Sequence, residues 1–473
     1  MSETQQADLQ RGLSNRHLQL IAIGGAIGTG LFMGSGRLAS VSGPAILFVY
    51  MVIGFFVFFI MRALGELLLS NLNYHTFGDI AKDLLGPWAG FFVSWTYWLS
   101  WIVACIADIV AIVGYVQYFN ENIPFWIPAV IAATLLLLLN LQPVKWFGET
   151  EFWFALIKIV AILSLIAVGI YLIATGFTSP SGTQASVRNL WEHGGLFPTG
   201  LHGFLLGFQM GIFGFIGVEL VGTASAETKN PHKTLPKAVN SIVMRITIFY
   251  IGALAVILSI TPWNELSGDK SPFVLTLSLA GFGLAAAAIN LVVLTSAASS
   301  ANSGLYSGTR MLFGLSRDGH APAIFSKVSK NNIPQSAAIF SGLLVFLSIP
   351  LMAIGGTVME AFTMISTVSS TFILFTWGSI VCSYIAYRMK HPERHEKSDF
   401  KMPLGKVMPW LILVFFVFIY FTLLLSDATR VPALIAPLWF VILTGLWLWR
   451  KSVLTKAGRP LTRSVPVVTE DER

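Results

Sequence analysis

Charged side chains are scarce in this sequence. Asp, Glu, Lys and Arg make up 11% of its 473 residues, whereas soluble globular domains carry roughly 25%. Hydrophobic residues make up 55% of the chain, and apolar runs long enough to cross a bilayer recur from end to end. The scarcity of charge therefore excludes a soluble protein with a large core and indicates a polytopic helical membrane protein.

Cysteine and enzyme motifs are also scarce. The two cysteines, Cys105 and Cys382, lie inside apolar runs, so we interpret them as packing residues rather than as a disulfide or a metal site. The sequence contains no phosphate-binding loop, no HExxH or GxSxG pattern at a span and no sizeable soluble domain. These absences argue against a nucleotide-driven pump, an intramembrane enzyme and, more weakly, a receptor that binds without transporting.

The apolar runs predict an all-α protein with twelve transmembrane helices. Since about 20 helical residues cross the hydrocarbon core, we place the spans at 17–37, 44–69, 88–118, 125–143, 152–176, 201–224, 240–262, 284–312, 336–356, 361–387, 408–426 and 432–450. The start of the eighth span is the least defined, because the apolar run 272–283 before it could form a short external helix.

The basic residues predict the orientation of the chain. Lys and Arg gather in cytoplasmic connections of membrane proteins, and their densest clusters here, 229–245, 310–330 and 388–406, fall in connections on one side. We therefore expect the N-terminal segment 1–16 and the tail 451–473 to be cytoplasmic. The net charge of +7 then indicates topology and contact with the lipid bilayer, not nucleic-acid binding.

Glycine is abundant in two of the expected helices. The first span contains LIAIGGAIGTGLFMGSG, and the sixth contains GFQMGIFGFIGVEL. Each glycine costs a helix about 1 kcal/mol relative to alanine. Glycine-interrupted spans in corresponding positions predict an inverted-repeat transporter whose helices unwind near the bilayer midplane.

Unwound backbone at these two breaks suits a zwitterionic ligand. Free N–H groups at the start of a half-helix suit a carboxylate, and free carbonyls suit an ammonium group. The alternative interpretation is close helix packing, since Gly24–Gly28 and Gly30–Gly34 both match the GxxxG motif. The matching break in the sixth span favours a binding site over packing alone.

Several runs of the sequence resemble a known family. NRHLQLIAIGGAIGTGLFMGSG, FGFIGVELVGTASAETKNP and SAASSANSGLYSGTRMLFGL are similar to segments of the amino acid–polyamine–organocation superfamily, in particular its bacterial amino-acid permeases. The likeness extends from about Leu13 to Arg450. It implies a LeuT-like five-plus-five inverted repeat, over 17–176 and 201–387, with two further helices over 408–450, in the bacterial cytoplasmic (inner) membrane.

The resemblance also implies a substrate site built mostly from backbone groups. In the first span, the N–H groups of Gly28, Thr29 and Gly30 would hold a carboxylate, and the carbonyl of Ala26 would accept from the α-amino group. In the sixth span, two further carbonyls would face the amino group, those of residues 213 and 216. The implied substrates are small neutral amino acids such as alanine, serine and glycine, in the D or the L form.

Two residues of the sixth span carry these carbonyls, Phe213 and Ile216. Phe213 stands where members of the family often have an aromatic gate. No strong acid or base is placed to bind a charged substrate side chain, so neutral substrates are favoured. We expect no cofactor, no metal and no catalytic residue, and a proton as the coupling ion.

Ionisable residues inside spans cost roughly 2.5–3.5 kcal/mol on insertion scales and therefore suggest function. Lys158 resembles the lysine that proton-coupled relatives place where sodium-coupled ones bind a cation. A desolvated lysine can alternate between charged and neutral forms, and the alternative is snorkelling toward the cytoplasm. Asp108 is either a proton-coupling partner of Lys158 or part of a structural interhelical hydrogen bond, and Glu219 either relays protons or braces the unwound segment.

Two further polar features have mainly structural interpretations. Glu66 lies four residues after Arg62, so we expect an ion pair near the inner membrane edge. The small polar residues of 295–303 permit close helix packing, although Ser299, Ser300 or Asn302 could contribute ligands.

The leading prediction is a secondary transporter that imports a small neutral amino acid with a proton. The alternative within transport is an amino-acid exchanger, which would use the same backbone site and leave Lys158 a structural role.

Overall fold

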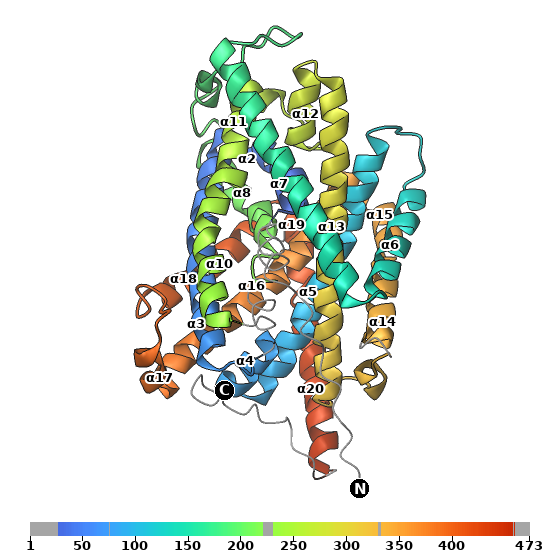
Figure 1. Cartoon of the computed structure of the whole chain (residues 1–473), viewed down its shortest axis with the longest axis vertical. Helices are drawn as coiled ribbons and strands as arrows, with labels where there is room; N and C mark the ends of the chain where they lie inside the picture. The colour runs from blue at the N-terminus through green and yellow to red at the C-terminus, as the bar shows by residue number, and fades with distance from the viewer. Residues whose placement is uncertain (1–26, 75, 221–229, 330–332, 457, 459–473) are drawn as a thin grey trace.

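The computed structural model describes residues 27–74, 76–220, 230–329, 333–456 and 458, and the regular elements in this part of the chain are helices (Figure 1). The helices before residue 220 are α2 Ser35–Ser42, α3 Ile46–Ser70, α4 Phe77–Leu85, α5 Pro87–Gln117, α6 Trp126–Asn140, α7 Val144–Thr175 and α8 Gly200–Gly211. Those after residue 230 are α10 Pro231–Arg245, α11 Ala253–Ile260, α12 Pro272–Leu279, α13 Gly283–Arg317, α14 Gln335–Val345, α15 Ser348–Gly355, α16 Val358–Lys390, α17 Pro392–Lys397, α18 Met408–Leu423, α19 Asp427–Ile435 and α20 Leu438–Lys456.

Short turns of tighter or wider helix join several of these helices. They are the π-helical turns η1 Gly30–Gly34 and η5 Ile246–Gly252, and the 3₁₀ turns η2 Gly43–Ala45, η3 Val187–Leu190, η4 Ile212–Phe215, η6 Trp263–Glu265 and η7 Ala323–Ser326. Gly43 has a φ of 60°, which a residue with a side chain rarely adopts. It ends α2, and Pro44 follows it, so α2 and α3 are separate helices.

The chain is a polytopic helical membrane protein, as its composition predicts. Within the described ranges, eight helical segments are long and apolar enough to cross a membrane, and three shorter apolar helices accompany them. The separate short helix anticipated before the eighth span is present as α12, which ends four residues before α13 begins.

Burial separates central helices from peripheral ones. In the most apolar stretch of α5, 78% of the residues are buried inside the protein, against 22% for the segment formed by α19 and α20. α5 packs closely on α13, where a Cβ added to Gly304 would lie 2.3 Å from the Trp101 ring. The corresponding stretch of α16 is 72% buried, so α5 and α16 form the centre of the bundle, α13 packs against α5, and the last two helices lie at the periphery.

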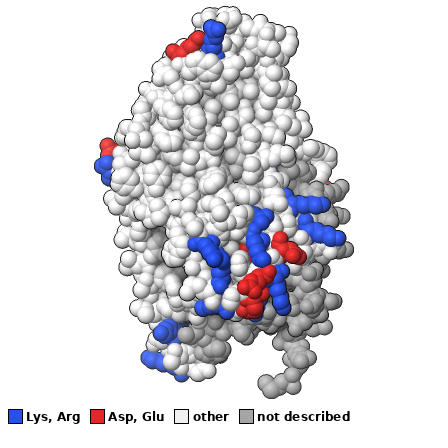
Figure 2. All heavy atoms as spheres, turned by 90° about the vertical axis from the view of Figure 1, so that its left-hand side faces the viewer, with Lys and Arg blue, Asp and Glu red and all other residues white. Residues whose placement is uncertain are grey.

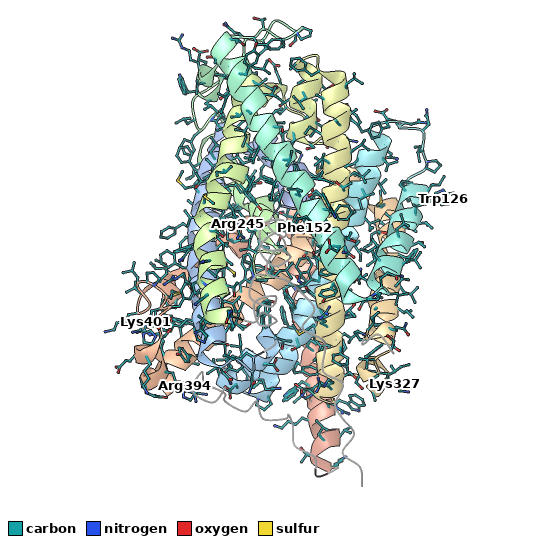
Figure 3. The ribbon with its side chains drawn as sticks, viewed as in Figure 1. Trp126, Phe152, Arg245, Lys327, Arg394 and Lys401 are labelled. Atoms are coloured by element: carbon teal, nitrogen blue, oxygen red, sulfur yellow. The ribbon has the colours of Figure 1, made fainter. Side chains whose placement is uncertain are left out.

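Charged side chains gather toward one end of the molecule. Figure 2 shows Lys and Arg, mixed with Asp and Glu, in the lower part of one face, whereas the area above them is uncharged apart from a pair at the top and another at the edge. Lys327, Arg394 and Lys401 lie at this lower end, and Arg245 of α10 lies higher, at mid-height (Figure 3). The uncharged area matches a surface that faces hydrocarbon.

Glu66, near the C-terminal end of α3, is buried among partners that the sequence did not indicate. Its carboxylate accepts a hydrogen bond from the Tyr384 hydroxyl at 3.1 Å and lies 2.5 Å from His395 Nδ1. The Arg62 guanidinium instead lies over the ring of Phe400, 3.8 Å from its centroid. The expected ion pair between Glu66 and Arg62 is therefore wrong, because α16 and α17, distant in sequence, supply closer partners than the same helix face.

The short helix α4 is tied to the end of α13 by a lysine. Thr76 and Asp79 form a capping box at the start of α4, and the Lys82 ammonium lies 3.4 Å from Asp79 and 2.8 Å from Asp318. Burial lowers the pKa of Lys82, but the two carboxylates outweigh burial and hold this pKa above its usual value. A raised lysine pKa means that the stabilisation is fully present below the ordinary lysine pKa and is lost as pH rises through the folded-state pKa.

Replacing Lys82 with methionine is expected to destabilise the protein modestly. Losing hydrogen bonds to two charged partners removes about 1–2 kcal/mol at neutral pH, which lowers the unfolding temperature by roughly 1–3 °C for a chain of this size. Thermal unfolding of detergent-purified protein measures the shift, with Lys451→Met on the exposed face of α20 as control. Equal unfolding temperatures for the two variants would contradict a tie between α4 and α13.

Candidate functional site

The sixth predicted span is broken where its glycines indicated. α8 ends at Gly211, the 3₁₀ turn η4 follows, and Ile216 is extended, with φ −60° and ψ 134°. Gly217 has a φ of 101°, which favours glycine and prevents the helix from continuing. The predicted interruption of this span is confirmed.

The first predicted span is described only from Ile27, so Ala26 lies outside the described residues. Ile27 and Gly28 are non-helical, and the carbonyl of Gly28 accepts from the N–H groups of Leu31 at 3.1 Å and Phe32 at 3.3 Å. The π-helical turn η1 begins at Gly30 and leads into α2. A half-helix thus starts at Gly28 to Gly30, and the first N–H groups of a helix have no partner within it.

The two breaks cross each other. A Cβ on Gly30 would lie 2.4 Å from the Cα and 2.7 Å from the N of Gly214, so the two backbones touch there. The Tyr250 hydroxyl donates a 2.6 Å hydrogen bond to the Gly214 carbonyl. Glycine at this crossing therefore has a packing role, and it also brings the two unwound segments to one place.

Thr29 and Asp108 are neighbours in this buried region. The Thr29 hydroxyl donates a hydrogen bond to the Asp108 carboxylate, and the two residues are 2% and 1% exposed. Across from them, Ser300 of α13 lies against Gly28, whose added Cβ would be 3.3 Å from the Ser300 hydroxyl. The structure thus brings Gly28, Thr29, Gly30 and Asp108 together.

Lys158 of α7 reaches the same break from another side. Its ammonium donates hydrogen bonds of 3.1 Å to the Ile27 carbonyl and 3.1 Å to the Ser299 hydroxyl. Ser296 donates to the same Ile27 carbonyl at 3.0 Å. Lys158 is 1% exposed, so its charge is held inside the protein, which does not favour snorkelling to the surface. The Asp108 carboxylate bonds Thr29, while its charge and that of Glu151 both act on Lys158.

Glu151, Ser296 and Asn140 are site neighbours that the sequence analysis did not select. Glu151 accepts hydrogen bonds from Ser299 at 2.7 Å and from Asn302 at 2.8 Å, and Asn140 donates to Asn302 at 2.9 Å. The available signal was spacing, because Glu151 precedes Lys158 by two helical turns and lies on the same face.

Glu219 is attached to the break of the sixth span. Its carboxylate accepts from the Gly217 N–H at 3.0 Å and from the Tyr97 hydroxyl at 3.4 Å. The first bond fixes the residue with positive φ, so these contacts fit the role of a brace, and they leave the proton-relay role a prediction.

Phe213 and Ile216 lie at the turn between η4 and the extended segment. The carbonyl of Phe213 accepts from the Ile216 N–H at 3.2 Å and, having two lone pairs, can accept a second donor. The Phe213 ring meets Phe362 of α16 edge-on, with centroids 5.6 Å apart. An aromatic pair from α16 and the sixth span thus stands beside the break.

This arrangement can hold a small zwitterion and move a proton. The half-helix start and Lys158 supply positive potential near Gly28 to Gly30, and main-chain carbonyls lie across the crossing at Gly214. Four ionisable side chains are buried around it, those of Lys158, Asp108, Glu219 and Glu151.

Comparisons with known proteins point to transport. Residues 17–455 match the family described as amino acid permease. The chain is 54% identical to the D-serine/D-alanine/glycine transporter of Escherichia coli (strain K12), covering 93% of this chain and 94% of that protein. It is similar also to amino-acid permease AapA of Bacillus subtilis (49% identical, 94% of this chain and 95% of the relative) and to DL-alanine permease SerP2 of Lactococcus lactis subsp. cremoris (39%, 94% and 96%).

Proposed function

The chain belongs to the amino acid permease family, a family of transporters rather than enzymes, and we propose that it imports small neutral amino acids together with a proton. The proposed substrates are D-serine, D-alanine and glycine, with L-alanine and L-serine as further candidates. The names of the E. coli and L. lactis relatives support this choice.

The crossing of the two broken helices carries the proposal. The half-helix start at Gly28 to Gly30 suits the substrate carboxylate, and the carbonyls near Phe213 and Ile216 suit its amino group. Because main-chain atoms make these contacts, they recognise the part that all amino acids share.

The proposed architecture is a LeuT-like five-plus-five inverted repeat followed by two helices, twelve spans in all. The eight long apolar segments and three shorter apolar helices of the described residues support this architecture, as do the breaks in the first and sixth predicted spans, which stand five spans apart. The proposed repeats are 17–176 and 201–387, with the last two spans over 408–450. Matching breaks in the two halves support this symmetry.

We place the protein in the bacterial inner membrane with both termini in the cytoplasm. Support comes from the basic residues, which lie mainly at one end of the bundle. Lys327, Arg394 and Lys401 belong to connections that face this end (Figure 3).

A proton is the proposed coupling ion, with Lys158, Asp108 and Glu219 as the groups that respond to it. Lys158 bridges the first break and α13 through the Ile27 carbonyl and Ser299. A charge held there draws the break toward α7 and α13, and neutralisation weakens that attraction. Proton binding and helix movement are thereby linked.

Uptake into proteoliposomes tests the proposed function. Labelled D- and L-alanine, D- and L-serine and glycine are supplied with an inward proton gradient imposed or absent. We expect accumulation against the substrate gradient only with the proton gradient. Uptake that needs internal amino acid and ignores the gradient would identify an exchanger instead.

A further inference from the structure

A continuous set of hydrogen bonds connects Lys158 to Glu151. The Lys158 ammonium donates to the Ser299 hydroxyl at 3.1 Å, and that hydroxyl donates to Glu151 Oε2 at 2.7 Å. One hydroxyl therefore joins the ammonium to a carboxylate. Phe152, the residue after Glu151, marks the level where α7 passes α13 (Figure 3).

Glu151 is a buried carboxylate held by neutral donors. It is 4% exposed and accepts from Ser299 and from Asn302, whose own amide oxygen accepts from Asn140 at 2.9 Å. Neutral donors compensate only part of the cost of burying a charge. A carboxylate in this environment is suited to being protonated during part of the transport cycle.

The position of Glu151 lies between Lys158 and the inner end of the bundle. Lys158 is two helical turns further from the start of α7, and Asn140 is the last residue of α6, at the turn that leads into α7. The chain of polar groups therefore runs from the substrate region to the turn between α6 and α7, which lies in the lower half of Figure 1.

The titratable and charged groups around this chain are few among the described residues. Lys158 interacts electrostatically with Asp108 of α5 and with Glu151. On the inner side, the ring of Tyr306 stacks on Phe147, and the Arg310 guanidinium lies 3.3 Å from the centroid of the Tyr306 ring. α13 presents hydroxyl and amide groups to Glu151 itself.

We propose that Glu151 takes the proton from Lys158 through the Ser299 hydroxyl and passes it toward the cytoplasm. This rests on the proposed proton symport. The N–H bond of Lys158 breaks and an O–H bond forms on Ser299, while the original Ser299 proton moves to Glu151. Lys158 is then neutral and Glu151 a neutral acid, which afterwards gives its proton to cytoplasmic water.

In this relay the two carboxylates lie on different sides of Lys158. Asp108 bonds Thr29 at the substrate break, and Glu151 bonds Ser299 away from it. Lys158 therefore stands between the substrate side and the inner side. Release of the proton inward no longer needs to pass the bound amino acid.

Replacing Glu151 with glutamine tests the relay in full-length protein in proteoliposomes, with labelled glycine as the probe. We expect proton-driven glycine accumulation to slow by about 10-fold or more. Glycine–glycine exchange, which needs no net proton release, should fall by less than about threefold. An alkaline interior should accelerate wild-type uptake and leave the variant unaffected.

Two further variants distinguish a relay from a structural role. Glu121→Gln removes an exposed carboxylate from the loop between α5 and α6, outside this set of hydrogen bonds, and should behave like wild type. Ser299→Ala removes the bridging hydroxyl and should reproduce the loss seen for Glu151→Gln, which also decides the matter if the glutamine variant does not fold. Glu151→Asp keeps a carboxylate and should restore part of the rate.

The outcomes separate the two proposals. Wild-type uptake that ignores the proton gradient overturns the symport and the relay together. Proton-driven wild-type uptake, with the rate and internal-pH profile of Glu151→Gln unchanged, overturns the relay alone. Equal loss of accumulation and exchange in Glu151→Gln and Ser299→Ala makes both residues structural and likewise overturns the relay.

Discussion

Replacing Gly30 with alanine is expected to reduce amino-acid uptake by roughly 10- to 100-fold, since overpacking costs about 1–3 kcal/mol and about 1.4 kcal/mol is a factor of ten. The added Cβ would lie 2.4 Å from the Gly214 Cα and 2.9 Å from the Phe213 carbonyl carbon. These are backbone atoms, which cannot turn aside as a side chain can. The two breaks would be forced apart, and the carboxylate and amino contacts would separate with them.

Gly34→Ala provides the matched control for Gly30→Ala. It changes the other glycine of the same GxxxG match, in the same short helical turn, but its Cβ would meet only the Met210 methyl carbon at 3.9 Å. Substrate affinity and initial uptake rate are measured for both, after confirming equal amounts of folded protein in the membrane. Equal loss in the two variants would show that the GxxxG packing matters and the crossing at Gly214 does not.

Removing the titratable amine of Lys158 is expected to abolish accumulation. With one proton per substrate, a gradient of one pH unit can drive about tenfold accumulation. Lys158→Met has no proton to exchange, and Lys158→Arg keeps a permanent charge because a guanidinium does not release its proton in proteins. Both variants should let substrate equilibrate at most, and the arginine variant should be slower because its charge stays fixed to the Ile27 carbonyl.

Accumulation of labelled glycine in proteoliposomes, with and without the imposed gradient, measures this effect. Lys451→Met, on the exposed face of α20, serves as the control for loss of one positive charge. Accumulation by Lys158→Met that still follows the pH gradient would remove Lys158 from the coupling mechanism. Asp108 or Glu219 would then have to carry the proton.

The broken helices could be predicted from sequence because glycine content acts locally. Gly211, Gly214 and Gly217 weaken one helix whatever surrounds them, and the break follows at Ile216 and Gly217. The helical membrane-protein class could be predicted for a similar reason, since a bilayer imposes a minimum apolar length on each span. For the apolar run 272–283, the sequence allowed either an extension of the eighth span or a separate short helix, and the structure has the short helix α12.

Partners of buried charges could not be predicted, because they depend on how helices are rotated and how deep they sit. Glu66 was assigned to Arg62 from helical spacing, yet it is held by Tyr384 and His395. The link between Glu151 and Lys158 could not be predicted for the same reason. Its distance from Lys158 along α7 is visible in the sequence, but the Ser299 bridge comes from α13, far along the chain.

The substrate site that we propose is made of main-chain atoms, and this has an evolutionary consequence. Most codon changes alter a side chain and leave the peptide N–H and C=O groups in place. Few such changes would therefore alter which small amino acids the site binds. A toxic analogue with the same amino and carboxyl groups would enter by the same route. Cells that escape it would do so by losing the transporter, and the codon of Gly30, where a single added carbon would collide with the Gly214 backbone, is a sensitive target.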